Sequence, residues 1–287
     1  DSFAIDYTLA SAEFLQENLQ YSFSNKNKNY LNYDLETFKR YILPFKIGNE
    51  EIEFYQDTLF MLFNNYSNSA YSFEENIETI NNKLNSIISY DKRYIYNKNI
   101  QSVEEILQNK KASLEEISIF KTKVFRSLGY AATMDYSPVL ADSSGSYAWT
   151  VVISPQGIEY PLDVKNGILS RLLNKQISKI FRRTYFTDST SLYFTKETKT
   201  NTPPYLGHYN QFDVTDKYIN TLNYKFNKTT NEEYQYLAVF NDGKWKPVDW
   251  AEGKNKSATF KKLGPNLIYL PVLWIGDSLV PHGEAFL

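Results

Sequence analysis

The sequence predicts an α+β fold, in which a helical amino-terminal region leads into a helix packed on an antiparallel sheet and a mostly-β unit follows. Through about the first 130 residues, apolar side chains recur every three or four positions, as in amphipathic helices. Three short strand patterns come next, and from about residue 187 strand patterns separated by turn residues dominate. We expect two domains, residues 1–186 with the helix-on-sheet core over about 102–186, and residues 187–287 as a β-sandwich-like unit.

Composition limits the functions that are open to the chain. The net charge of −2 gives no basic field, so we expect no nucleic-acid partner. Cysteine is absent from the sequence, which excludes disulfides, thiolate metal sites and a cysteine nucleophile. Only two histidines occur, His208 and His282, and a histidine-rich metal centre is therefore not expected; His208 reads as a solvated loop residue. We expect neither a metal nor a cofactor.

The helices before residue 110 read as a scaffold. Ser72 with Glu75, and Ser102 with Glu105, have the spacing of capping boxes at helix amino termini. Pro44 ends one short helix, because proline cannot continue the hydrogen-bond ladder. The predicted helical segments lie within residues 5–22, 33–45, 50–66, 73–87 and 103–109.

A further capping box, Ser113 with Glu116, opens the helix predicted over residues 114–128. Gly129 stands where a left-handed residue ends such a helix. Three strand patterns follow, at 130–140, 147–153 and 157–164. On the middle strand the residues that share one face by their alternation, and that we expect to lie against the helix, are Tyr147, Trp149, Val151 and Ile153.

Towards the carboxyl end, residues 166–186 read as an amphipathic helix with a basic end. Strand patterns cover 191–197, 219–228, 234–241, 244–251, 258–263 and 266–274. The clearest hairpin turns at Asn241-Asp242-Gly243. The tryptophans of this unit form either a sandwich core or an exposed platform for a sugar or peptide: Trp245, Trp250 and Trp274.

Several of these segments resemble transglutaminase-like proteins. The stretch "ASLEEISIFKTKVFRSLGYAATMDYSP" is similar to the core helix and first strand of that family, "YAWTVV" to its His-Ala-Trp strand, and "YPLD" to the strand that carries its Asp. "EFLQENLQYSF", "FKRYILPFKIGNEE", "FDVTDKY", "YLAVFNDGKWKPVDWA" and "NLIYLPVLW" resemble the helical lead-in and β-rich tail of a bacterial cell-envelope branch. The core positions that match are Arg126, Gly129, Ala132, Asp135, Tyr136 and Pro138.

The resemblance implies a papain-like fold. Position by position, however, it argues against the cysteine–histidine–aspartate catalysis of the family. The family's cysteine position falls on Leu114, or on Ser113 if the register shifts by one residue; its histidine position is Tyr147, and its aspartate is retained as Asp163. Leucine is no nucleophile, and a tyrosine with a pKa near 10 is a poor base at neutral pH. Two of the three catalytic positions are therefore lost.

What remains of the site has two readings. Either Tyr147, Asp163, Asp135 and Trp149 line a binding groove, or Tyr147 and Asp163 satisfy each other in a closed core, since a buried aspartate needs partners. "ADSSGS", at 141–146, would be a mobile rim of that groove; it lacks the lysine of a phosphate loop.

Carboxylates on neighbouring segments leave glycoside hydrolysis open, because two of them ~5–9 Å apart suffice for it. The candidates are Glu115, Glu116, Asp135, Asp142 and Asp163. The first two also suit the first turn of a helix, where acids interact favourably with the helix dipole.

Two functional classes follow. The first is a non-catalytic binding or scaffold protein of the bacterial cell envelope that recognises a peptide or glycan or an envelope protein partner. The second is an active hydrolase or acyl transferase with rebuilt non-thiol chemistry. No apolar run approaches the ~20 residues of a membrane helix. Because the chain begins at Asp1 rather than Met, we expect a removed leader and an extracytoplasmic location, with a lipid anchor ahead of residue 1 as one option.

Overall fold

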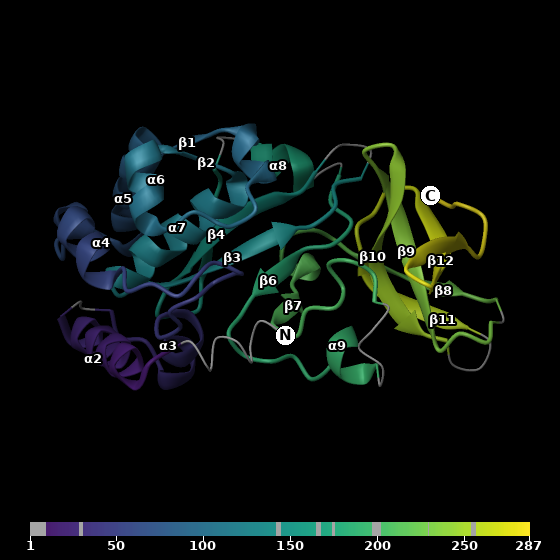
Figure 1. The fold of residues 1–287 in the computed structure, drawn as a ribbon, viewed down its shortest axis with the longest axis horizontal. Helices are drawn as coiled ribbons and strands as arrows, with labels where there is room; N and C mark the ends of the chain where they lie inside the picture. The colour runs from purple at the N-terminus through teal and green to yellow at the C-terminus, as the bar shows by residue number, and fades with distance from the viewer. Residues whose placement is uncertain are drawn as a thin grey trace. The chain divides into compact units, whose positions relative to one another are not determined.

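The structure is a computed structural model that describes residues 10–28, 31–141, 145–164, 168–173, 176–196, 202–228, 230–253 and 257–287. Contacts divide the chain into two compact units. The first comprises Asp1–Asp135, Ala148–Val164 and Arg183–Tyr185, and the second comprises Tyr136–Tyr147, Lys165–Arg182 and Phe186–Leu287. Helices predominate up to residue 127 and strands after it (Figure 1), an order that fits an α+β class.

The first unit contains the predicted helices. They are α2 (Ala12–Lys28), α3 (Leu35–Tyr41), α4 (Gln56–Phe63), α5 (Phe73–Ile87), α6 (Val103–Asn109) and α7 (Leu114–Ser127). The capping boxes predicted at Ser72, Ser102 and Ser113 are all present. Gly129, with φ of 83°, follows α7 in the left-handed conformation, as predicted. The beginning of the helix predicted over 5–22 lies outside the described residues.

Helix α7 is the centre of the first unit. Every residue from 116 to 127 is buried, although the sequence stripe predicted only one apolar face. Polar residues on the other faces are accommodated by specific partners. Near the end of the helix, the Arg126 guanidinium donates to the backbone carbonyls of Ala132 (2.9 Å), Pro44 (2.8 Å) and Lys46 (3.1 Å). One side chain thereby connects the helix, the following strand and the segment after α3.

Three of the predicted strands belong to one five-stranded sheet. They are β3 (Ala131–Ser137), β4 (Tyr147–Ile153) and β5 (Glu159–Leu162), and β4 pairs antiparallel with β5, with Thr150 opposite Leu162. The strand patterns expected at 147–153 and 157–164 are therefore neighbours in an antiparallel pair. The sheet has the order β5-β4-β3-β6-β7, in which β6 is Phe181–Arg183 and β7 is Gln211–Asp213. Strand β5 lies at its edge, where Pro161 is tolerated.

The predicted orientation of strand β4 is wrong. The Thr150 hydroxyl donates to the backbone carbonyl of Ser118 on α7 at 3.0 Å, so Thr150 faces that helix. Because neighbouring residues of a strand point to opposite faces, Trp149 and Val151 point away from it. Every residue of β4 is buried, so alternation of polarity could not distinguish the two faces.

The second unit contains the helices α8 (Ile168–Leu173) and α9 (Leu192–Thr195) and most of the carboxyl-terminal strands. One sheet has the order β10-β9-β12-β13, and a second pairs β11 with β8. These strands are β8 (Leu222–Phe226), β9 (Tyr234–Asn241), β10 (Lys244–Glu252), β11 (Ala258–Leu263), β12 (Tyr269–Ile275) and β13 (Ser278–Pro281). Side chains of both sheets share one core, which includes Leu237, Val248, Phe260 and Tyr269.

The β9–β10 hairpin confirms the turn prediction, because Asp242 (φ 52°) and Gly243 (φ 73°) are both left-handed. Two other predictions for this region are wrong. Residues 191–197, expected as a strand, contain helix α9, and the long helix expected over 166–186 is only α8, with strand β6 inside the same range. An apolar run as short as 191–197 does not distinguish a strand from a helix.

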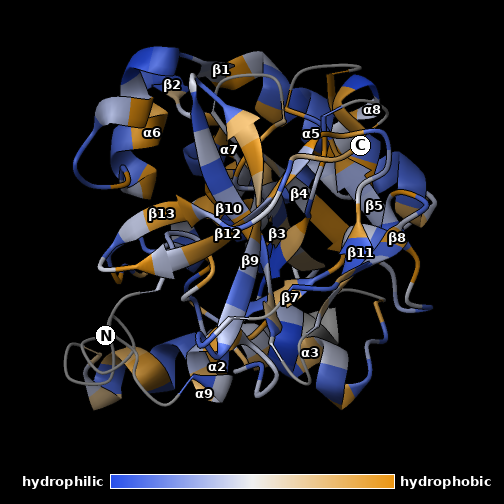
Figure 2. Cartoon of the chain, turned by 90° about the vertical axis from the view of Figure 1, so that its right-hand side faces the viewer, coloured by the Kyte–Doolittle hydropathy of each residue, from blue (hydrophilic) through white to orange (hydrophobic). Residues whose placement is uncertain are grey.

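Figure 2 shows hydrophobic segments interleaved with hydrophilic ones along helices and strands alike. In the part of the chain that the structure describes, no helix has both the length and the apolar composition needed to cross a membrane.

Candidate functional site

The amino-terminal end of α7 is where the sequence resemblance led us to expect the position of a nucleophile. Ser113 is the N-cap residue, and its hydroxyl accepts a hydrogen bond from the Glu116 backbone N–H at 3.3 Å. In return the Glu116 carboxylate accepts from the Ser113 backbone N–H at 2.8 Å. Leu114, the first residue of the helix, is half-buried. Ser113 is thus buried and engaged in capping, and the residue that follows it, Leu114, is apolar.

Glu115 is the second residue of α7, and it is the acid at this end of the helix that solvent or a ligand can contact. Its side chain is exposed to solvent, yet its pKa is raised, first by the desolvation that surrounding protein causes, and further by the charges of Glu50 and Glu116. Arg183 opposes the rise. A carboxyl that touches solvent and is still partly desolvated by the protein around it lies in a recess of the surface. Gly48 is close by: a Cβ on it would lie 3.9 Å from Glu115 Oε1.

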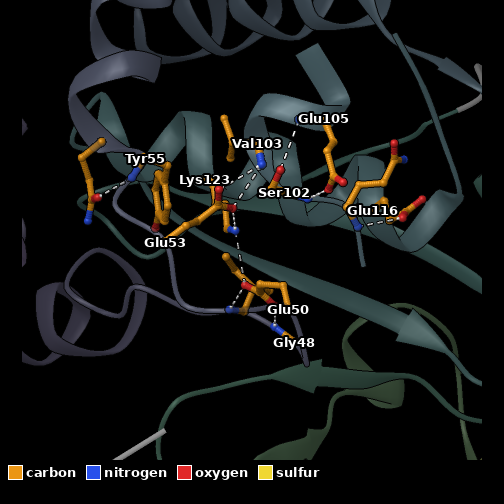
Figure 3. A network of polar contacts seen from close by, with 12 residues as sticks. Gly48, Glu50, Glu53, Tyr55, Ser102, Val103, Glu105, Glu116 and Lys123 are labelled. Carbon is orange, nitrogen blue, oxygen red and sulfur yellow. Dashed lines mark hydrogen bonds and ion pairs between the residues drawn. The ribbon is translucent and has the colours of Figure 1, made fainter. Parts of the chain in front are cut away.

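A buried lysine organises the acids beside this position (Figure 3). Lys123 on α7 is 1% exposed, and its ammonium lies 2.7 Å from Glu53 Oε1 and 3.8 Å from Glu50 Oε1. It also lies over the Tyr55 ring, 5.0 Å from the centroid. A buried charge needs such partners to offset the loss of hydration.

The same acids also bind backbone N–H groups. Glu50 accepts from Ile47 and Gly48, each at 2.7 Å. Glu53 accepts from the backbone N–H of Val103, the first residue of α6, through both oxygens (3.1 and 3.2 Å). A carboxylate at that point satisfies an otherwise unpaired helix N–H and interacts favourably with the helix dipole.

A cavity of about 180 Å³ opens beside this network. It is lined by Glu50, Glu51, Ile52, Glu53, Asn99, Ile100, Gln101, Ser102 and Glu105, and we call it the acidic recess. Its ionisable lining residues are all glutamates. Two of them, Glu50 and Glu53, form ion pairs with Lys123. Glu51 is exposed at its rim. Among the described residues, no group of His, Asp or Glu side chains is arranged to hold a metal ion. The recess therefore suits an organic cation or a ligand rich in hydrogen-bond donors.

The other residues predicted for the site are distributed over the sheet. Asp135 on β3 is fully buried, as is Trp149 on β4. Tyr147 at the start of β4 is buried and falls in the second unit, whereas Asp163 after β5 is half-buried and falls in the first. Asp142 lies outside the described residues. Neither Tyr147 nor Asp163 lines the acidic recess, and the groove predicted around them stays a prediction.

Asp163 acts electrostatically on a second buried lysine. Lys121 is 1% exposed, and its ammonium donates to the side-chain oxygens of Asn81 and Asn85, both at 2.7 Å. Burial lowers the pKa of Lys121 to about 8, and the charge of Asp163 opposes this. A lysine of this pKa has the right proton affinity for a base, but its burial keeps it from a substrate.

Sequence reasoning missed the Lys123 network. The run "GNEEIEF" gave one signal, since it concentrates three acids in a short segment, and two lysines on a helix otherwise rich in apolar residues gave another. In the second unit, the three carboxyl-terminal tryptophans are all half-buried, so they form neither a closed core nor an open platform.

No protein-family model matches the sequence, and no curated protein matches it. Solved structures match in part. A candidate cysteine protease from Cytophaga hutchinsonii has a TM-score of 0.33 and 10% identity over 43% of this chain and 39% of that one. A TGase has a TM-score of 0.31 and 15% identity over 54% of this chain and 39% of that one. The chain thus spans about two fifths of each structure, and the likeness is a weak one of fold alone.

Proposed function

We propose that the chain is a non-catalytic binding protein that uses a transglutaminase-like helix-on-sheet unit to recognise a peptide or glycan. The observation that carries the proposal is the start of α7. Leu114 occupies the position of a nucleophile, the Ser113 hydroxyl is engaged in capping, and the sequence has no cysteine and no histidine before residue 208. Nucleophilic catalysis needs an activated nucleophile with a base within hydrogen-bond reach.

The acidic recess supports a peptide ligand that carries a lysine or arginine side chain. Glu51 and Glu105 add negative charge to Glu50 and Glu53, which form ion pairs with Lys123. Glu115 adds a further carboxyl near Gly48. A cationic side chain entering the recess would gain charge-assisted hydrogen bonds to its glutamate carboxylates. A location in the bacterial cell envelope is also proposed, and it rests on the sequence resemblance alone.

Binding can be tested with the acetylated, amidated tripeptides Ala-Lys-Ala and Ala-Arg-Ala, with norleucine in the central position as the neutral control, followed by ligand-observed NMR. We expect the cationic peptides to bind the full chain and the norleucine peptide not to bind. Glu51→Gln should weaken binding two- to fivefold, and the matched control Glu78→Gln, on an exposed position of α5, should leave it unchanged.

Two outcomes would contradict the proposal in different ways. Equal binding of the norleucine peptide, or binding of N-acetylglucosamine oligomers instead, would remove the role of the acidic recess while leaving a binding function. Cleavage or cross-linking of the peptides by purified protein, lost in Ser113→Ala, would show that the chain is an enzyme.

One observation favours the alternative of an active hydrolase or acyl transferase. Glu115 is accessible and its pKa is raised by desolvation, which are properties of a general acid. Its carboxyl would protonate a leaving group, with Glu50 or Glu116 as the second acid. In that case Glu115→Gln abolishes turnover of a glycoside or amide substrate, whereas under the leading proposal there is no turnover to abolish.

A further inference from the structure

The second unit has a polar cavity of its own, and Trp250 is the one residue of its lining that the sequence analysis had named for a binding surface. Its volume is about 120 Å³, the share of about four water molecules. Its walls come from the start of β6, the segment around α9, strand β7 and strand β10. The lining residues are Phe181, Asp188, Thr190, Ser191, Leu192, Leu206, Gln211, Asp213, Asp249 and Trp250.

A buried ion triad lies at one side of this cavity. Lys179, itself buried, places its ammonium 2.7 Å from Asp213 Oδ2 and 3.3 Å from Asp249 Oδ2, and donates at 2.6 Å to the backbone carbonyl of Lys261. The ammonium therefore has hydrogen bonds to Asp213 and to the Lys261 carbonyl, and an ion pair without a hydrogen bond to Asp249. With Asp188 also in the wall, the lining contains three carboxylates, and Lys179 pairs with two of them, Asp213 and Asp249.

Two polar atoms in the wall lack a hydrogen bond. Ser191 is 8% exposed, and its hydroxyl has no hydrogen-bond partner among the described residues; although it precedes α9, it does not cap that helix. Asp249 is 9% exposed, and its Oδ2 has the ion pair with Lys179 but no hydrogen bond. A buried hydroxyl left in this state is costly, because it has lost its hydration and gained no partner in return. Both atoms are therefore places where a ligand with N–H donors gains stabilisation.

The rest of the wall is apolar. Leu192 and Leu206 are buried, and Phe181 and the half-buried Trp250 add aromatic surface. Gln211, by contrast, is already satisfied, since its side-chain oxygen accepts from Tyr136 and its amide donates to the Tyr205 carbonyl. The cavity thus combines an acidic corner with a short apolar wall.

We propose that this cavity binds a small primary ammonium compound, whose N–H groups bond to Asp249 and Ser191 and whose short aliphatic stem contacts Leu192 and Leu206. A metal ion fits less well, because no group of three carboxylate or imidazole side chains among the described residues is arranged to hold one. The aromatic surface of Trp250 adds favourable contact for a cation. The volume admits a stem of about three or four carbon atoms.

The test uses the full chain and propylammonium chloride, with 1-propanol as a neutral analogue and tetramethylammonium as a cation without N–H donors. Binding is followed by saturation-transfer NMR and by titration of protein resonances. We expect saturable binding of propylammonium only. Asp249→Asn should weaken it at least tenfold and Ser191→Ala three- to tenfold. Asp242→Asn, which removes the same charge at the exposed β9–β10 turn, should change nothing.

The parent protein supplies a check that needs no variant. The charges of Lys179 and Asp213 act on Asp249, and burial raises the pKa of Asp249 to about 6. Propylammonium stays charged throughout the acidic range, so its binding should weaken as the pH falls from 7.5 to 5. The proposal is overturned if 1-propanol or tetramethylammonium binds equally well, if Ser191→Ala and Asp249→Asn both bind like the parent, or if nothing binds and the cavity holds water only.

Discussion

Replacing Lys123 by methionine is the sharpest test of what holds α7 in place. The substitution keeps the length of the side chain and removes the ammonium that lies 2.7 Å from Glu53 and 3.8 Å from Glu50. Glu50, at 2% exposure, is then a buried carboxylate without its counter-charge. Removing one partner of a buried pair typically costs about 3–5 kcal/mol.

The lower end of that range is expected here. Glu53 is 24% exposed and can be partly hydrated, and Glu50 keeps its two backbone hydrogen bonds at 2.7 Å. We therefore expect Lys123→Met to lower the free energy of opening α7 by about 3 kcal/mol, which is roughly 150-fold in the opening equilibrium.

Hydrogen–deuterium exchange with mass spectrometry measures this segment by segment. Peptides from residues 114–127 should exchange roughly 150-fold faster in Lys123→Met, whereas peptides from 234–252 in the second unit should not change. The matched control is Lys98→Met, at an exposed position of the first unit. Acceleration below tenfold would refute the reasoning, as would equal acceleration in the control.

A second variant separates the charge effect from lost packing. In Lys123→Met/Glu50→Gln the uncompensated carboxylate is gone, so much of the lost protection should return. If the double variant is no more stable than the single one, the cost lies in packing and the electrostatic account is wrong.

Three further predictions concern single groups. Tyr33→Phe removes the hydroxyl that donates to the Ile153 carbonyl at 2.7 Å, and urea unfolding should show a loss of about 1 kcal/mol. Ser113→Ala removes the cap of α7, and the same measurement should show a loss of about 1 kcal/mol. Burial raises the pKa of Asp249 from 3.8 to about 6, so the folded state holds a proton that the unfolded chain has released between these values. This group's contribution to stability should therefore fall as the pH rises from about 4 to 6. Asp249→Asn should abolish that slope in a pH series of unfolding free energies.

The sequence by itself determined the local structure where short-range chemistry is decisive. The serines at 72, 102 and 113, each with a glutamate three residues later, gave three helix starts, because a capping box is complete within four residues. Asp242 and Gly243 gave the hairpin turn, since both residues tolerate a positive φ. The apolar patterns between residues 130 and 164 gave the strands and the β4–β5 pairing.

Only the tertiary structure decided which side chains meet. Strand β4 is buried on both faces, so its sequence could not show that Thr150 rather than Trp149 turns towards α7. Lys123 and Glu53 are 70 residues apart, and Lys179 and Asp249 are 70 residues apart as well, so no local pattern links either pair. Burial makes these distant charges depend on each other, because a charge removed from water must find its partner wherever the fold brings one near.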